Sequence, residues 1–271
     1  MREGFKLVSS NIDIVKKYNT QITTPQYFHS IIYQIYSKFY YKEYGGLIVA
    51  RKSAIMGNYN LMAYCLYPIT AKTEEELHTH KFSLRGTKLF HSNNMDYVEY
   101  IYDTQQYPAI QGKQFARMRN MIKRFPTTCE TGYHKDIDEV VNAWSKDTKT
   151  KHQRKLWRVI KQHLTNVSIL LTRCYWEGQI VGFSCVENIG NGGVIIMRLI
   201  HPDIKKKIKE PNLLIHYWDC CNNTGLLNIG MARSKEIKTA KLKLRPVKTL
   251  QYYKYVRDKE NNLTRAEWHS F

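Results

Sequence analysis

The sequence contains no run of about 18 apolar residues, and its first residues, Met1 to Lys17, are mixed polar. We therefore expect neither a membrane-spanning helix nor a secretory signal. The six cysteines form no CxxC motif and no Cys/His spacing of the kind that binds zinc. Their spacing predicts no disulfide framework and no metal site, and it favours a reduced, cytoplasmic protein.

Common catalytic motifs are missing as well, because the sequence has no paired carboxylates, no Ser/His/Asp set and no P-loop. Of its ten histidines, His134, His152 and His216 stand in contexts typical of ordinary surface or core residues. Glycine and proline are scarce, with 14 and 7 residues in 271, whereas lysine, asparagine, isoleucine and tyrosine are frequent. This bias suggests an AT-rich genome, such as that of a virus.

Acidic residues are few beside basic ones, 23 against 42, which gives a formal net charge of +19. The excess is local. Residues 113–161 carry 13 basic and 5 acidic side chains, and residues 201–271 carry 15 and 7, whereas residues 162–200 are apolar and neutral. This pattern predicts a neutral sheet flanked by two basic segments that face a polyanion; a generally lysine-rich, solvated surface is the alternative.

The first hundred residues predict a helix followed by strands. Apolar residues recur at helical spacing from Phe28 to Phe39, with Thr24 as the N-cap and Pro25 in the first turn. The later patterns predict a hairpin of 47–50 with 59–66 around a turn at 56–58, a helix from 73–80 and a strand at 96–102.

Residues 112–125 predict an amphipathic helix that ends at Pro126. Phe115, Met118, Ile122 and Phe125 form one apolar stripe at helical spacing. We predict that the opposite face binds a nucleic acid or a donor, and a merely solvated face is the alternative. The polar and basic residues of this face are Lys113, Arg117, Arg119, Asn120, Lys123 and Arg124.

The second half of the chain predicts an α+β arrangement. A further basic helical segment at 140–161 precedes three strands in succession, which we expect to form an antiparallel meander. A helix at 213–221 follows. The three strands are expected at 168–175, 180–186 and 194–200.

The stretch from Leu226 to Tyr255 is the most informative part of the sequence. Its first apolar run closes on Gly230, which indicates a sharp turn or a close approach to a ligand. From Ala240 to Arg245 apolar and cationic residues alternate, which predicts a strand with one buried and one cationic face. An edge strand kept soluble by its lysines is the alternative.

Three groups of residues, taken in order, resemble a known family. They are Gly112-Lys113-Gln114-Phe115 with Arg119-Asn120, the hairpin Trp176 to Phe183, and Lys238-Thr239-Ala240-Lys241-Leu242 with Pro246. Over roughly residues 100–255 they resemble the C-terminal domain family of phosphatidylglycerol lysyltransferases, which is related to the Fem aminoacyltransferases. The resemblance implies an α+β fold of two tandem acetyltransferase-like (GNAT) repeats, with mixed or antiparallel sheets flanked by helices. Residues 1–105 would be a first, degenerate repeat, and residues 106–271 the repeat with the site.

The resemblance also implies transfer of an aminoacyl group from a charged tRNA to an amine or a hydroxyl. An aminoacyl ester is already activated, so transfer needs positioning, a stabilised oxyanion and removal of a proton. Lys238 and Lys241 are expected to stabilise the oxyanion or hold phosphates, and Asn228 and Tyr252 to orient the nucleophile. Gly230, Lys243 and Arg245 are expected to bind the donor together with the basic helix.

Two departures from the family narrow this hypothesis. The acidic pair before the glycine is replaced by Leu227-Asn228, so a lysyl group is not expected. The segment Pro202 to Asn212 has no glycine, so the pyrophosphate loop of a simple acyl-CoA enzyme is missing.

We therefore predict an acyl- or aminoacyltransferase that uses or modifies a nucleic acid, tRNA or DNA, with aminoacyl-tRNA or acyl-CoA as donor. We expect no metal and no membrane partner. One alternative is a non-enzymatic nucleic-acid-binding protein on a degenerate GNAT scaffold. Another is a GNAT-like enzyme that modifies DNA bases.

Overall fold

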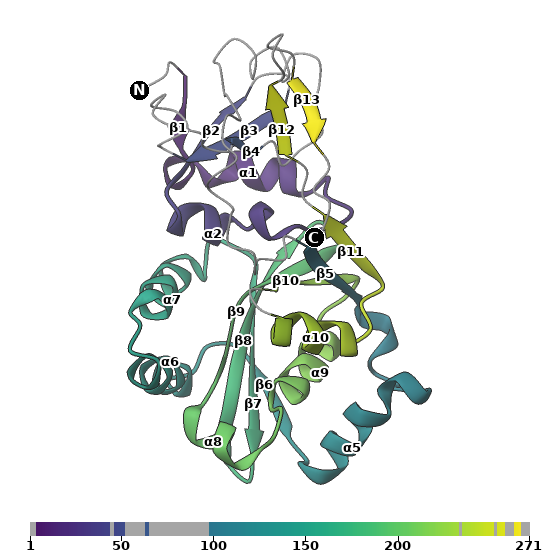
Figure 1. The fold of residues 1–271 in the computed structure, drawn as a ribbon. Helices are drawn as coiled ribbons and strands as arrows, with labels where there is room; N and C mark the ends of the chain where they lie inside the picture. The colour runs from purple at the N-terminus through teal and green to yellow at the C-terminus, as the bar shows by residue number, and fades with distance from the viewer. Residues whose placement is uncertain are drawn as a thin grey trace.

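The structure is a computed structural model that describes residues 4–43, 46–51, 63–64, 98–232, 235–251, 254–257 and 263–266. A seven-stranded sheet forms its centre, with helices on both faces, and a four-stranded sheet lies at one end (Figure 1). The α+β class predicted from the sequence, with a mixed sheet flanked by helices, is confirmed.

The large sheet has the strand order β11-β5-β10-β9-β8-β7-β6. All neighbours are antiparallel except β9 and β10, which are parallel. A parallel pair needs a crossover connection, and the chain makes it through α8 (Pro202–Lys207) and α9 (Asn212–Asn222). The strands are β5 (Val98–Asp103), β6 (Thr128–Thr131), β7 (Ile169–Trp176), β8 (Gln179–Ile189), β9 (Gly192–Ile200), β10 (Leu226–Met231) and β11 (Lys248–Gln251).

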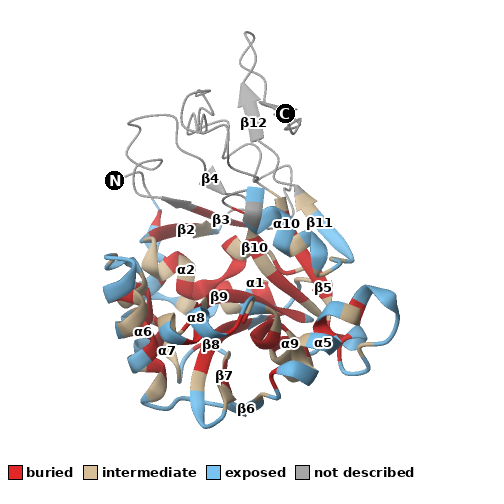
Figure 2. Cartoon of the chain, turned by 60° about the horizontal axis from the view of Figure 1, so that its bottom comes forward, coloured by how far each residue is buried: buried red, intermediate tan, exposed pale blue. Residues whose placement is uncertain are grey.

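Helices cover both faces of this sheet. α6 (Asp136–Asp147) and α7 (His152–His163) pack on one face, and α5 (Ala116–Arg124), α9 and α10 (Lys235–Lys243) lie on the other (Figure 1). Strand β8 is accordingly buried on both sides over residues 181–187. Figure 2 shows these buried strands between helices whose outer faces are exposed.

Local sequence explains why α6 and α7 form and how they pack. In α6, Ile137, Val140 and Val141 recur at helical spacing and are buried. Its first turn is acidic, which suits the positive end of the helix dipole. In α7, Leu156 and Ile160 are four residues apart and also buried.

The N-terminal part builds the smaller antiparallel sheet, in the order β1-β2-β3-β4. Its hydrophobic side chains join the main core, where Ile32 and Phe39 pack in one cluster with Ile137 and Phe183. The elements of this part are β1 (Lys6–Leu7), α1 (Ile12–Asn19), α2 (Ile31–Tyr36), β2 (Phe39–Glu43), β3 (Leu47–Arg51) and β4 (Ala63–Tyr64). Near the C-terminus, β12 (Lys254–Arg257) pairs with β13 (Leu263–Ala266). Short 3-10 helices span Val8–Ser10, Tyr27–His29, Thr104–Gln106 and Lys113–Phe115.

The division into two repeats at residue 105 stays a prediction. Strand β5 precedes this boundary, yet it pairs with β10 and β11 in the large sheet. The two halves of the chain are therefore joined by a shared strand as well as by a shared core.

Most elements predicted for the second half are present. The helix at 112–125, the meander, the helix at 213–221 and the strand at 96–102 correspond to α5, β7 to β9, α9 and β5. The basic segment at 140–161 is two helices, α6 and α7. Strand β6 and helix α8 were not predicted, because both are short and polar.

The strand predicted from Ala240 to Arg245 is wrong. These residues belong to helix α10 and the turn after it. An alternation of six residues is too short to exclude a helix, in which Lys238 and Lys241 also share a face. The Thr239 hydroxyl and the Lys241 ammonium both bond to main-chain carbonyls in this helical arrangement.

The predicted start and end of the first helix are also wrong. Ser30, not Thr24, caps α2, since its Oγ accepts from the main-chain N–H of Tyr33 at 3.0 Å. Phe39 begins strand β2 instead of ending the helix. The antiparallel pairing of β3 with β4 agrees with the predicted hairpin. The turn at 56–58 and the helix from 73–80 lie outside the described residues.

Candidate functional site

The C-terminal end of β10 brings together two of the predicted catalytic residues, Asn228 and Lys241. The pairing of β10 with β5 is irregular between Asn228 and Met231, and Gly230 in this interval has φ +70°. The strand continues to Met231, so the chain forms a bulge here and not the sharp turn that was one of the two predictions for Gly230. Asn228 is buried, and its Oδ1 accepts from the N–H of Gly230 at 2.7 Å. Its Nδ2 donates to the carbonyl of Pro25 at 2.8 Å and to the buried carboxylate of Glu99. Asn228 therefore holds the bulge and ties it to the N-terminal part.

Lys241 contacts the same bulge from α10. Its ammonium donates to the carbonyls of Ile229, Gly230 and Met231 at 2.7, 2.6 and 2.9 Å. It also lies 5.4 Å from the centre of the Tyr100 ring. A lysine ammonium has three N–H donors, so the three carbonyls occupy all of them. To stabilise an oxyanion, Lys241 would have to release one carbonyl.

The other cations predicted around this stretch lie at the surface. Lys238, Lys243 and Arg245 are exposed on α10 and the turn that follows it. They are accessible to a large anion such as a phosphate backbone. Tyr252 lies outside the described residues.

The basic face of α5 is partly occupied by contacts within the protein. Arg117 forms a two-pronged ion pair with Glu210, with Nε 2.7 Å from Oε2. Arg119 donates to the carbonyls of Ile110 and Gly112 at 2.6 and 2.8 Å, so it braces the turn before the helix. Within the described residues, the side chains of this face that are exposed and form no ion pair are Lys113, Asn120, Lys123 and Arg124.

Sequence reasoning missed a buried polar network between the large sheet and α9. Ser184 on β8 lies opposite Arg198 on β9, and the Asp219 carboxylate on α9 accepts hydrogen bonds from both. Ser184 and Asp219 are fully buried, and the Arg198 side chain is 14% exposed. Burial raises the pKa of Asp219, whereas the charge of Arg198 and the hydrogen bonds from Arg198 and Ser184 oppose this rise.

His216 extends this network to Tyr107. Its Nδ1 lies 3.4 Å from Nη2 of Arg198, and its Nε2 lies 3.1 Å from the Tyr107 hydroxyl, which itself donates to the carbonyl of Leu244 at 2.9 Å. Because the hydroxyl proton is already used, we assign the ring hydrogen to Nε2 and the accepting lone pair to Nδ1. This is a neutral imidazole, in agreement with burial and Arg198, which hold the pKa of His216 well below its ordinary value.

The sequence carried one signal of this network. Arg198 and Ser184 interrupt runs of apolar residues in strands that are otherwise buried. A charged side chain in such a strand requires a partner. The partner could not be identified, because Asp219 lies on a different element.

The network lies where β9 and β10 part. The two strands pair only at Leu226–Gly192, Leu227–Gly193 and Asn228–Val194. Strand β9 continues to Ile200, so Arg198 belongs to a length of β9 that β10 does not pair. An unpaired strand edge can bind an extended ligand through main-chain hydrogen bonds.

The connection between β9 and α9 is poorly suited to bind a pyrophosphate. A helix N-terminus favours an anion, but Glu210 places a carboxylate two residues before the first residue of α9. Glu210 adopts φ +95°, a conformation that glycine would normally supply, and it pairs with Arg117.

The described part of the chain brings no three His, Cys, Asp or Glu side chains into a metal-binding arrangement. None of its helices combines the length and the apolar character that crossing a bilayer requires.

The sequence matches no known family and no curated protein. Solved structures do match. A conserved protein of unknown function from Bacteroides thetaiotaomicron VPI-5482 has a TM-score of 0.68 at 15% identity, over 92% of this chain and 97% of that one. A tandem GNAT protein from the clavulanic acid biosynthesis pathway has a TM-score of 0.43 at 8% identity, over 89% and 93% of the two chains. For L-PGS from Bacillus licheniformis the TM-score is 0.38 at 15% identity, over 71% and 64%. The likeness to the Bacteroides protein shows a shared fold over nearly the whole length of both chains.

Proposed function

We propose that the protein is an acyl- or aminoacyltransferase of the GNAT type that uses or modifies a nucleic acid, with an aminoacyl-tRNA as its donor. The observation that carries this proposal is the early parting of β9 from β10, with Arg198 on the unpaired length of β9. The acyl part of a donor lies there as an extended segment, and its carbonyl approaches the buried network.

Arg198 is the residue suited to polarise that carbonyl. Its Nε is buried and has no hydrogen-bond partner among the described residues. Its Nη2 is fixed by Asp219 and His216, so the guanidinium is already oriented. A preorganised donor of this kind stabilises the negative charge that develops on oxygen during acyl transfer.

The exposed cations support a nucleic acid as donor or acceptor. α5 and α10 lie on the same side of the large sheet as the network (Figure 1). Their exposed cations can contact phosphates, and phosphate contacts dominate the affinity of proteins for nucleic acids. The exposed cations of these two helices and the turn after α10 are Lys113, Lys123, Arg124, Lys238, Lys243 and Arg245.

An aminoacyl ester fits this chain better than acyl-CoA. The segment before α9 lacks glycine, and Glu210 brings a carboxylate to the helix end where a pyrophosphate would bind. Both features disfavour an anion at that position.

Transfer can be tested with tRNA that carries a labelled aminoacyl group and, separately, with labelled acetyl-CoA. Label recovered by mass spectrometry on an added amine, hydroxyl or nucleic acid from the tRNA arm supports the proposal. We expect Arg198→Lys, which keeps the charge beside Asp219 but removes Nε, to lower the transfer rate by about 10²-fold. Transfer from acetyl-CoA alone, or full transfer by Arg198→Lys, would contradict the proposed donor or the proposed role.

The nucleic-acid surface is tested with two lysine pairs. Lys113→Gln/Lys123→Gln removes two exposed cations from α5, and Lys151→Gln/Lys155→Gln removes two at the start of α7, on the opposite face of the sheet. We expect only the first variant to weaken tRNA binding and to reduce the salt slope, by roughly 0.7–0.9 for each phosphate that is no longer neutralised. Equal effects of the two variants would indicate a diffuse basic surface.

One observation favours a second function, binding without transfer. Lys241, the predicted catalytic cation, uses all three N–H donors in hydrogen bonds to main-chain carbonyls. Salt-sensitive binding of nucleic acid with no transfer in either arm would support this binding protein. Label or mass added to DNA bases would instead support a DNA-modifying enzyme.

A further inference from the structure

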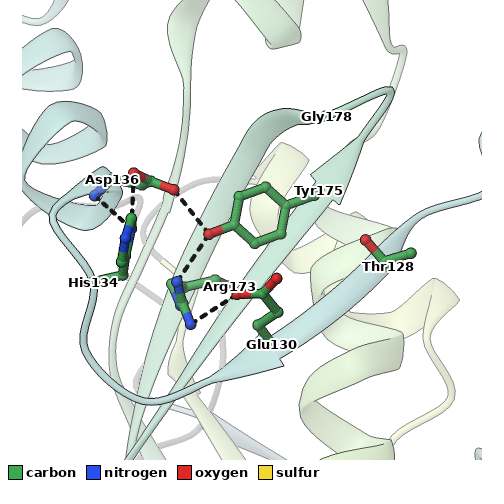
Figure 3. Close-up of a pocket in the computed structure, with 7 residues that line it drawn as sticks. All are labelled: Thr128, Glu130, His134, Asp136, Arg173, Tyr175 and Gly178. Atoms are coloured by element: carbon green, nitrogen blue, oxygen red, sulfur yellow. Dashed lines mark hydrogen bonds and ion pairs between the residues drawn. The ribbon is translucent and has the colours of Figure 1, made fainter.

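A cavity of about 460 Å³ lies at the outer edge of the large sheet, beside the start of α6 (Figure 3). This volume is within the range of sites for small molecules, roughly 300–1,000 Å³. Glu130 on β6 and Arg173 on β7 are direct cross-strand partners, so both side chains stand on the same face of the sheet. His134 approaches them from the turn before α6, and Asp136 approaches them as the first residue of α6.

The polar side chains of the cavity are already organised by one another. Arg173 donates from Nη1 to the Tyr175 hydroxyl at 3.0 Å, and this hydroxyl donates to Oδ2 of Asp136 at 2.9 Å. Oδ1 of Asp136 lies 2.9 Å from Nδ1 of His134. At the other end, Nη2 of Arg173 lies 3.0 Å from Oε2 of Glu130. Burial and the bond to Asp136 raise the pKa of Tyr175 to about 12, which keeps its hydroxyl a donor.

Three polar atoms of this chain remain for a ligand. The Arg173 side chain is 9% exposed, and its Nε is buried and has no hydrogen-bond partner among the described residues. Oε1 of Glu130 and Nε2 of His134 also have no hydrogen bond within the described part of the molecule. Nδ1 of His134 lies 2.9 Å from Oδ1 of Asp136 and 3.5 Å from the main-chain nitrogen of Asp136. We assign the ring hydrogen to Nδ1, where it meets the nearer carboxylate oxygen, so Nε2 is an acceptor. The cavity therefore offers one buried donor and two acceptors.

The one donor and two acceptors of the cavity indicate which kind of ligand it can bind. Two carboxylates and one guanidinium give the cavity a slight negative excess, which disfavours a simple anion. A simple amine would satisfy Glu130 and His134 but would leave Nε of Arg173 buried without an acceptor, which is costly. A zwitterion with an ammonium and a carboxylate on neighbouring atoms satisfies all three groups.

We propose that this cavity binds a free α-amino acid, with its ammonium between Glu130 and His134 and its carboxylate on Nε of Arg173. The site is separate from the transfer chemistry proposed above, and its test needs no donor or nucleic acid. It lies on the face of the sheet that carries α6, whereas Arg198 and its partners lie under α9.

The test follows main-chain amide chemical shifts of the isotope-labelled full chain during titration with three probes. L-alanine carries both charges, N-acetyl-L-alanine lacks the ammonium, and ethylamine lacks the carboxylate. We expect saturable shifts around Gly178 and His134 with L-alanine, and at least about tenfold weaker binding of the other two, since each lacks one charge-assisted hydrogen bond. Equal binding of N-acetyl-L-alanine or ethylamine, or no shift with L-alanine, would overturn the proposal.

A matched pair of variants locates the ammonium. Glu130→Gln removes the carboxylate charge but keeps an oxygen for Arg173, and the Glu130 side chain is 60% exposed, so the fold should tolerate the change. Glu177→Gln makes the same chemical change at an exposed turn beside the cavity. L-alanine should bind about tenfold more weakly to Glu130→Gln and unchanged to Glu177→Gln. Equal affinities of the two variants contradict the assignment.

Discussion

Buried and partly buried ionisable side chains in this protein find hydrogen-bond partners in two different ways. Glu187 and Lys241 are bound by the main chain: Glu187 accepts from the Ser30 hydroxyl at 2.6 Å and from the N–H groups of Ile31 and Ile32 at 2.7 and 3.2 Å. Lys241 donates to three carbonyls of β10. We call these two residues the main-chain-bound charges.

Under α9 the charges are satisfied by other side chains instead. Arg198, Asp219, Ser184 and His216 bond to one another, and we call them the side-chain network. Main-chain-bound charges fix the position of the backbone: Glu187 caps α2, and Lys241 holds the end of β10. Two partner side chains can both be substituted, whereas a main-chain N–H or carbonyl remains after any substitution. The comparison therefore predicts that only defects in the side-chain network can be rescued by a second substitution.

The largest expected effect is in the side-chain network. Asp219→Leu leaves the Arg198 charge without its partner and should lower the free energy of unfolding by about 3–5 kcal/mol. Arg198→Met together with Asp219→Leu removes both charges and should cost less than Asp219→Leu alone. Urea unfolding of the three proteins measures this. If the double variant lost as much free energy of unfolding as its two single variants together, the side-chain network would not differ from the main-chain-bound charges.

The next effect is at Glu187. Glu187→Leu leaves two main-chain N–H groups buried without an acceptor, which should cost about 3 kcal/mol. Adding Ser30→Ala removes the third donor but not these two, and it also removes the side-chain cap of α2, so the destabilisation should persist and increase by about 1 kcal/mol. Recovery of stability in the double variant would contradict the assignment of Glu187 to the main-chain-bound class.

Lys241 and Lys243 form a matched pair on α10. Lys241→Met breaks three hydrogen bonds to carbonyls and should cost about 1.5–3 kcal/mol, whereas exposed Lys243→Met should change stability by less than about 0.5 kcal/mol. Transfer should be abolished in Lys241→Met, because the end of β10 is no longer held. Retained transfer in that variant would remove Lys241 from the site.

The smallest effect is in the pH dependence of stability. The pKa of His216 is held below 6.5, so below pH 6.5 the unfolded chain binds a proton that the folded chain does not. The free energy of unfolding then falls toward acid, by up to about 1.4 kcal/mol per pH unit. Burial raises the pKa of Glu187 from 4.5 to about 7, so between these values the folded chain holds the extra proton. That contribution falls as the pH rises.

The two residues therefore oppose each other between pH 4.5 and 6.5, and single variants should separate them. We expect His216→Gln to remove the fall in stability toward acid, and Glu187→Gln to remove the fall toward neutral pH and leave a steeper rise. Thermal or urea unfolding across this range measures both slopes. Unchanged slopes in the two variants would show that neither group titrates as the comparison requires.

Local patterns were reliable where the elements are long. The stripe of Phe115 and Met118 predicted helix α5, and both side chains are buried as expected. The meander followed from β-branched runs separated by turn residues. The short alternation around Lys241 gave a wrong strand prediction, because six residues do not distinguish a strand from a helix. The hydrogen-bond partners of Lys241 come from β10, which the alternation does not encode.

By itself the sequence determined the class of the fold, most elements of its second half, a special backbone conformation at Gly230 and the two basic segments. These depend on residues near one another in the chain, through periodicity and turn geometry. Only the tertiary structure decided which polar groups are occupied and which are left for a ligand. Asn228 bonds to Pro25 across 203 positions, and Glu187 bonds to Ser30 across 157. No local pattern encodes such a partner, because hydrogen bonding of a buried group depends on whatever the fold places next to it.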